Sequence, residues 1–329
     1  MRPPVSTTEL PYARAVVNGI ELSYVDLGEG PLVLLLHGFP ELAYSWRHQI
    51  GPLAEAGYRV VAPDLRGYGS SGAPAAVDAY TYLDIIGDLV GLMDQLGYRD
   101  AVVVGHDMGA FVAWYMALLL PQRVRAVAGL SVALRHRPAE PPTKILEAVY
   151  GQDFYQIRFQ EPGRIDEELA RRVEDFLPGS FVGLSGSAPE PVESLVIPPG
   201  MGFADLFPAP ERLPEWLTEE EMDVYVESFR RSGFTGPLNW YRNIDRNWAL
   251  LSPWNGAPVT VPAMYLAGEQ DITYRIARET GGLTDMEETV TDLRETIVIP
   301  GCGHWVNQEQ PEAVNEALSR LLTIADHAA

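Results

Sequence analysis

The residues with the clearest chemical potential form one pentapeptide, Gly105-His106-Asp107-Met108-Gly109. It follows an apolar run at 101–104, and the pattern glycine, x, nucleophile, x, glycine is typical of a tight turn between a strand and a helix. Such a turn presents its central side chain, here Asp107, in a cleft where many hydrolases have serine. A carboxylate there suits displacement at a saturated carbon, which leaves an ester that water must then cleave. The alternative is that Asp107 only caps the following helix.

Two side chains later in the sequence can complete this chemistry. Asp271 follows an apolar run at 263–267, and His304 follows a run at 296–299. In folds with this type of turn, the acid and the histidine come after the nucleophile in chain order, each on a loop after a strand. We therefore expect His304 to activate water for attack on the ester, with Asp271 orienting its ring. Glu269 remains an alternative partner for the imidazole.

The loop His37-Gly38-Phe39-Pro40 follows the first long apolar run of the sequence. Its use is expected in its backbone, because the N–H groups of Phe39 and Met108 can form an oxyanion hole. His37 is expected to be a hydrogen-bonding residue rather than a catalyst, and His106 to point away from the cleft. The residues expected to line the substrate pocket are His37, Pro40 and Trp305.

A second string, Gly236 to Asn243, supplies the phenol of Tyr241. A tyrosine with an ordinary pKa of about 10 is neutral near pH 7 and can protonate a leaving oxygen.

The elements that must position these groups alternate between strand and helix. Short apolar runs bounded by polar or glycine-rich loops are typical of strands buried on both faces of a parallel sheet. Helical patterns lie between them, one beginning at a capping box, Thr81-Tyr82-Leu83-Asp84, and one at 110–120. The sequence therefore predicts an α/β fold with a mostly parallel central sheet flanked by helices. The predicted strands are 31–36, 58–62, 101–104, 263–267 and 296–299.

The interval 135–246 interrupts this alternation. It reads as helices with almost no strand signal, and we interpret it as a helical cap inserted into a core formed by 1–134 and 247–329. Within it, 13 of the 38 residues from 178 to 215 are proline or glycine, which predicts a long ordered loop. Thr218 is expected to cap a further helix that stops near Gly233.

Composition excludes several classes of partner. With 24 basic and 45 acidic residues the formal net charge is −21, so we expect no binding to nucleic acid or to anionic membranes. The single cysteine, Cys302, excludes an intramolecular disulfide and fits a reducing compartment. The longest apolar stretch, 110–120, is too short to cross a bilayer, and no signal peptide is visible, so a cytoplasmic protein is expected. Lys144 is the only lysine, which indicates high-GC, bacterial coding.

No cofactor is expected either. No histidine, cysteine or acidic spacing suggests a metal site. The string 67–72 matches the dinucleotide-binding fingerprint literally, but it does not open a helix directly after a strand.

Taken together, these strings resemble the soluble epoxide hydrolases of the α/β-hydrolase fold. The resemblance covers the chain from about residue 15 to 310 and implies hydrolysis of an epoxide to a vicinal diol through an ester on Asp107. It also implies two cap tyrosines, Tyr155 and Tyr241, that hold and protonate the epoxide oxygen, with Tyr150 a rival for the first. One departure is Met108, where the family commonly has tryptophan, and this leaves the substrate range open. The matching strings are 37–41, 44–47, 64–69, 105–109, 159–163, 236–243 and 303–305.

Two other functions are compatible with the same fold. A haloalkane or haloacid dehalogenase can use the same aspartate, acid and histidine, but Met108 offers no side-chain donor for a departing halide. A non-catalytic ligand-binding protein would not need Asp107, Asp271 and His304 together. The expected partner is a small epoxide, and the chain is a candidate homodimer.

Overall fold

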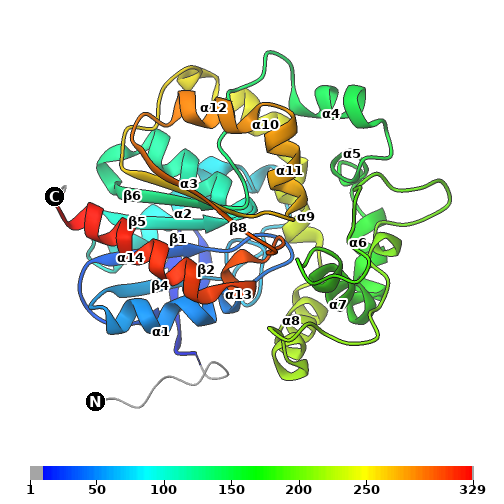
Figure 1. The fold of residues 1–329 in the computed structure, drawn as a ribbon, viewed down its shortest axis with the longest axis horizontal. Helices are drawn as coiled ribbons and strands as arrows, with labels where there is room; N and C mark the ends of the chain where they lie inside the picture. Colours follow the sequence, from blue (N-terminus) through cyan, green and yellow to red (C-terminus); the bar gives the residue numbers. More distant parts are fainter. Residues whose placement is uncertain (1–9, 328–329) are drawn as a thin grey trace.

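A computed structural model describes residues 10–327, so the expectation about a signal peptide falls largely on residues 1–9, outside the described part. The described chain is organised around an eight-stranded sheet with the order β1-β2-β4-β3-β5-β6-β7-β8 (Figure 1). Neighbouring strands from β4 to β8 pair in parallel, whereas β1 and β2 form an antiparallel hairpin at one edge. The predicted fold class is confirmed. The strands are β1 Tyr12–Val17, β2 Ile20–Leu27, β3 Leu32–Leu36, β4 Arg59–Pro63, β5 Ala101–His106, β6 Val124–Leu130, β7 Ala263–Gly268 and β8 Leu293–Ile299.

Each predicted apolar run lies on a strand, and every residue of β3, β5 and β7 is buried. Three strands were not predicted: β1, β2 and β6. The hairpin of β1 and β2 turns at Asn18-Gly19, where both residues have positive φ, 47° and 79°. This dipeptide is a strong hairpin signal, and it explains why the chain reverses between β1 and β2.

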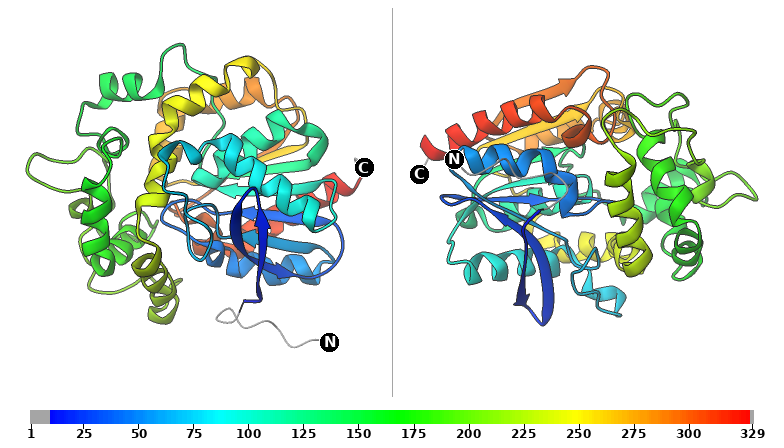
Figure 2. Two further views of the ribbon diagram at one scale, coloured as in Figure 1. Left: turned by 180° about the vertical axis from the view of Figure 1, so that it is seen from behind. Right: turned by 90° about the horizontal axis from the view of Figure 1, so that it is seen from below.

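Helices cover both faces of the sheet, as alternation of the strand side chains requires. Helices α1 Arg47–Glu55 and α14 Pro311–His327 lie on one face, and α2 Tyr82–Gln95 and α3 Met108–Leu119 lie on the other (Figure 2). Each face of the sheet has its own apolar core. In β3, Val33 and Leu35 belong to the core beneath α1 and α14, and Leu34 and Leu36 belong to the core beneath α2 and α3. The remaining core helices are α11 Ile272–Glu279, α12 Gly282–Thr289 and α13 Val306–Glu309, with 3-10 turns at η1 Ala43–Trp46, η2 Val77–Ala79, η3 Pro121–Arg123 and η5 Ser252–Trp254.

The two helix starts predicted at Thr81 and Thr218 are confirmed, and both are capped by hydrogen bonds. Thr81 accepts from the N–H of Asp84 and Thr218 from that of Glu221, each in a complete capping box, and Gly233 ends the second helix with φ 69°. In the first turn of α2, Leu83 is 40% exposed, whereas Tyr82 is buried.

Between β6 and β7 the chain forms a cluster of helices beside the core (Figure 1). The expected loop at 178–215 is shorter than predicted, because α7 continues through Pro178 to Gly183, and the short turn η4 Ala204–Leu206 interrupts the rest. Burial of Phe176, Leu177 and Phe181 on one side of α7 outweighs the hydrogen bond that Pro178 cannot donate. The expected boundary at 246 falls inside α10, so we propose that the cap ends with that helix. Its helices are α4 Pro142–Tyr150, α5 Tyr155–Arg158, α6 Arg164–Arg171, α7 Val173–Gly183, α8 Glu219–Ser232, α9 Thr235–Arg242 and α10 Ile244–Leu250.

Within residues 10–327, none of the helices combines the length and the apolarity needed to cross a membrane.

Candidate active site

Asp107 stands alone at the turn between β5 and α3, with φ 50° and ψ −118°. Such positive φ is strained for a residue with a side chain, and it directs the carboxylate away from the helix that follows. Both flanking positions must be glycine because there is no room for a side chain. A Cβ on Gly105 would overlap the carbonyl oxygen of Gly109, and a Cβ on Gly109 would overlap the carbonyl oxygen of Leu36. The Asp107 side chain makes no capping hydrogen bond to α3, so the capping alternative was wrong.

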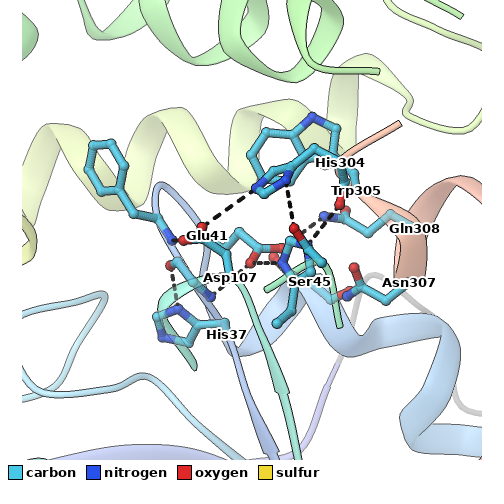
Figure 3. A network of polar contacts seen from close by, with 12 residues as sticks. His37, Glu41, Ser45, Asp107, His304, Trp305, Asn307 and Gln308 are labelled. Atoms are coloured by element: carbon cyan, nitrogen blue, oxygen red, sulfur yellow. Dashed lines mark hydrogen bonds and ion pairs between the residues drawn. The ribbon is translucent and has the colours of Figure 1, made fainter. Parts of the chain in front are cut away.

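The carboxylate of Asp107 lies between the loop at 37–40 and His304 (Figure 3). The Phe39 N–H donates to Asp107 Oδ1 at 3.0 Å, and His304 Nε2 lies 3.7 Å from Asp107 Oδ2. Gly38 allows this approach, because a Cβ there would overlap the Asp107 side chain. The predicted nucleophile, base and first oxyanion donor are therefore brought together.

His304 is held between two carboxylates. Its Nδ1 lies 3.1 Å from Oδ1 of Asp271, which is fully buried, whereas Glu269 is exposed and accepts from Gly301 N–H at 3.3 Å. Asp271, not Glu269, is thus the partner of the imidazole. Burial alone would lower the pKa of His304, but the charges of Asp271 and Asp107 raise it to about 9. The pKa of Asp271 moves down against the effect of its burial, because His304 stabilises the carboxylate.

The side chains of the two predicted tyrosines lie close together in the helices between β6 and β7. Tyr155 opens α5 and Tyr241 lies in α9, with ring centroids 6.0 Å apart. Burial, and then the charge of Asp107, raises the pKa of both phenols, so each keeps its proton at neutral pH. Gln160 ties the two elements together, donating to the Gln156 and Tyr241 carbonyl oxygens at 2.8 and 2.9 Å. The rival Tyr150 instead stacks on Phe154, with centroids 4.5 Å apart.

Two residues expected to line the pocket are used for packing. His37 is 1% exposed; its Nδ1 lies 2.9 Å from the Gly38 carbonyl oxygen, and its Nε2 accepts from the Leu65 N–H at 3.0 Å. Trp305 is fully buried, stacks on Phe181 and donates to the Phe181 carbonyl oxygen at 2.9 Å. That these two side chains also line the substrate pocket stays a prediction.

Pro40 is also buried, joined to Phe39 by a cis peptide bond. Aromatic rings contributed by the cap surround the Phe39 ring: its neighbours within 6.4 Å, centroid to centroid, are Phe159, Phe176, Phe234 and Tyr241.

Glu41 is a buried acid near the site that was not predicted from the sequence. Glu41 accepts from Gly38 N–H at 2.8 Å and lies 2.6 Å from His106 Nδ1, and His106 Nε2 is 2.8 Å from the carbonyl oxygen of His304. His106 therefore has both ring nitrogens engaged, one by Glu41 and one by the backbone of His304. Although burial opposes it, the charge of His106 lowers the pKa of Glu41 to about 2. Glu41 follows an apolar run in a loop, a placement that could have marked it as a buried carboxylate.

Ser131, the residue after β6, is a second site residue that was not predicted from the sequence. Its hydroxyl lies 2.6 Å from Asp271 Oδ2 and 3.0 Å from His304 Nδ1. No local motif marks this position, because only the pairing of β6 with β7 brings it beside Asp271.

The loop that carries His304 is fastened to the cap. The N–H of His304 donates to the Leu184 carbonyl oxygen at 2.9 Å. The Glu309 carboxylate accepts from the N–H groups of Gly303 and Trp305 and also from that of Gly186 in the cap, at 3.1, 3.0 and 2.8 Å. Core and cap therefore share one half-buried acceptor close to the base.

Among residues 10–327, no group of three or more histidine, cysteine or acidic side chains is arranged to hold a metal ion.

Comparison with known proteins agrees with this geometry. Residues 31–311 match the family model described as alpha/beta hydrolase fold. Epoxide hydrolase A of Mycobacterium tuberculosis is 44% identical over 93% of this chain and 95% of its own, and Epoxide hydrolase 3 of Siraitia grosvenorii is 44% identical over 91% and 93%. The crystal structure of Epoxide Hydrolase A from Mycobacterium thermoresistibile superposes with a TM-score of 0.89 at 46% identity, covering 96% of this chain and 98% of that one.

Proposed function

The chain belongs to the α/β-hydrolase fold family and is an epoxide hydrolase, and on that basis we propose the route by which it converts an epoxide to a vicinal diol. The observation that carries the route is the position of His304 between the nucleophile Asp107 and the acid Asp271, with Tyr155 and Tyr241 placed on the cap.

In the first step, a carboxylate oxygen of Asp107 attacks a ring carbon and the carbon–oxygen bond of the epoxide breaks. Tyr155 and Tyr241 hydrogen-bond the ring oxygen, and one of them donates its proton to it. Their raised pKa keeps both phenols protonated until the ring oxygen becomes strongly basic. The products are a hydroxyalkyl ester on Asp107 and one tyrosinate.

Ester formation then prepares the base. The negative charge of Asp107 is one of the causes that raise the pKa of His304 to about 9. Alkylation removes that charge, so the pKa of His304 falls and the ring releases its proton to solvent, from which it takes up a proton again once the Asp107 carboxylate is restored. His304 thus becomes a base at the stage of the reaction that needs one.

In the second step, water attacks the ester carbonyl carbon and transfers a proton to His304 Nε2. The N–H groups of Phe39 and Met108 stabilise the resulting oxyanion. Collapse of this intermediate releases the diol, which takes up the proton from His304. Asp107 returns to its carboxylate, and the second proton of the water restores the tyrosine.

A single-turnover reaction in ¹⁸O-labelled water, with enzyme in excess over a panel of aryl and alkyl epoxides, tests this route. Mass spectrometry follows the diol and the peptide that contains Asp107. We expect label in Asp107 and an unlabelled diol, because the carboxylate supplies the first oxygen. Labelled diol with unlabelled Asp107 would mean direct attack by water and would overturn the assignment of the nucleophile.

We also propose that the enzyme is bacterial and cytoplasmic, as the arginine-rich composition and the single buried cysteine, Cys302, support. It needs no cofactor on this route, since side chains and water supply every proton and the nucleophile. A homodimer remains a proposal for its assembly.

A further inference from the structure

Ser131 follows β6 directly and has a backbone that few residues adopt. Its φ is 72°, and within residues 10–327 only Asn18 and Asp107 share positive φ among residues other than glycine. Asn18 lies in a hairpin turn, where this conformation is common, and Asp107 is the nucleophile. Strained conformations of this kind persist where the surroundings hold them, and they gather at functional sites.

The neighbouring strand holds the Ser131 backbone in place. Its N–H donates to the Leu266 carbonyl oxygen at 2.7 Å, and its carbonyl oxygen accepts from the Tyr265 hydroxyl at 2.8 Å. Both partners belong to β7, the strand that leads to Asp271. The side chain of Ser131 is consequently fixed relative to the acid.

The Ser131 hydroxyl lies between the acid and the base. A hydroxyl has one proton to donate and can accept others. Oδ1 of Asp271 already receives the N–H of Thr273 at 2.8 Å and lies 3.1 Å from His304 Nδ1. Oδ2 has a single donor among residues 10–327, the hydroxyl of Ser131 at 2.6 Å. Once that proton is given to Oδ2, the Ser131 oxygen has two lone pairs, one of which can accept from the Nδ1–H of His304 at 3.0 Å and the other from the Thr273 hydroxyl at 2.8 Å.

We propose that Ser131 is a positioning residue for the second half-reaction, an inference that rests on the proposed function. Its hydroxyl fixes the rotation of the Asp271 carboxylate and shares the Nδ1–H of His304 with it. Both effects hold the tautomer whose Nε2 lone pair faces the water that attacks the ester. Ser131 does not touch the substrate, and the first step needs neither effect.

Loss of the hydroxyl leaves one oxygen of a buried, ionised carboxylate without a donor. A buried charged group without its hydrogen bond costs much more free energy than a hydrogen bond lost between neutral groups that water can reach. We therefore expect ester hydrolysis to slow by about tenfold to a hundredfold, the range for hydrogen bonds to charged groups, while the alkylation rate stays within about twofold.

The test compares Ser131→Ala and Ser131→Gly with the wild type in single-turnover quench experiments. Both substitutions remove the hydroxyl, but glycine also relieves the positive φ, so the pair separates the side chain from the backbone. Ser180→Ala is the matched control, since Ser180 is a buried serine of α7 whose hydroxyl donates to the Leu177 carbonyl oxygen at 2.8 Å. Mass spectrometry of the peptide with Asp107 measures formation and decay of the ester.

We expect the ester to accumulate in both Ser131 variants and not in the control. As a second readout, the downfield proton resonance of His304 Nδ1–H should shift or broaden in both. A glycine variant with wild-type decay would assign the effect to the backbone and overturn the proposal, as would equal slowing of both steps. A wild-type enzyme that forms no ester at all would overturn the route itself, and with it this role.

Discussion

Nε2 of His304 lies 3.7 Å from Oδ2 of Asp107, while Nδ1 of the same ring faces Asp271. The two carboxylates together hold the pKa of His304 at about 9. Asp107→Asn removes the charge much as the ester does, so we expect the pKa of His304 to fall below that value. Titration of the imidazole resonances by NMR measures it. An unchanged pKa in the variant would contradict the idea that alkylation prepares the base.

His304→Gln should form the ester and fail to hydrolyse it. Glutamine cannot accept a proton from water, and general-base catalysis contributes about 10²- to 10⁴-fold to a rate. Mass spectrometry of the peptide with Asp107 should show a persistent mass increase equal to that of the epoxide. Turnover at the wild-type rate would remove His304 from its assigned role.

Tyr241→Phe and Tyr155→Phe should slow alkylation, each by about 100-fold, because the departing oxygen loses a proton donor or a hydrogen bond. Decay of the ester should change little. Quenched-flow measurement of ester formation separates the two steps. Tyr150→Phe is the matched control, because its ring stacks on Phe154, and equal slowing in that variant would contradict the choice of Tyr155.

Stability should fall at alkaline pH through His304. Its pKa is about 9 in the folded protein and 6.5 as an ordinary value, so its stabilising contribution is complete below pH 6.5 and lost as the pH rises through 9. The shift corresponds to about 3 kcal/mol. Denaturant unfolding between pH 6 and 10 should show a smaller decline for His304→Gln than for the wild type, and parallel curves would contradict the assignment.

The ion pair between Arg47 of α1 and Glu221 of α8 joins core to cap, with 2.7 Å between Nε and Oε1 and the arginine side chain fully buried. Glu221→Gln should reduce the free energy of unfolding by about 3 kcal/mol, because it leaves a buried guanidinium without its counter-charge. Glu219→Gln, exposed in the same turn, is the control and should change stability by no more than about 0.5 kcal/mol. Equal effects would show that Arg47 does not depend on this carboxylate.

The sequence was most informative where local chemistry is restrictive. Asp107, Asp271 and His304 each follow a strand that ends in an apolar run, so their meeting at one edge of the sheet could be predicted from the strands alone. Thr81 and Thr218 similarly mark helix starts through contacts made within one turn.

What could not be predicted depends on contacts between distant segments. Ser131 and Glu41 acquire their roles from strand pairing and from a histidine far along the chain. Trp305 lies next to the base in sequence, but the residue that stacks on its ring, Phe181, comes from a distant segment. Pro178 indicated a loop, but the apolar face of α7 kept it helical.

The attachment of Glu309 to both Gly186 and the histidine loop limits how this enzyme can admit its substrate. If the whole cap moved away as a rigid body, the hydrogen bonds of the 184–186 segment would displace His304 each time. Helix α4, by contrast, buries none of its residues and takes no part in that attachment. The alignment of the base thus depends on how the 184–186 segment of the cap is held.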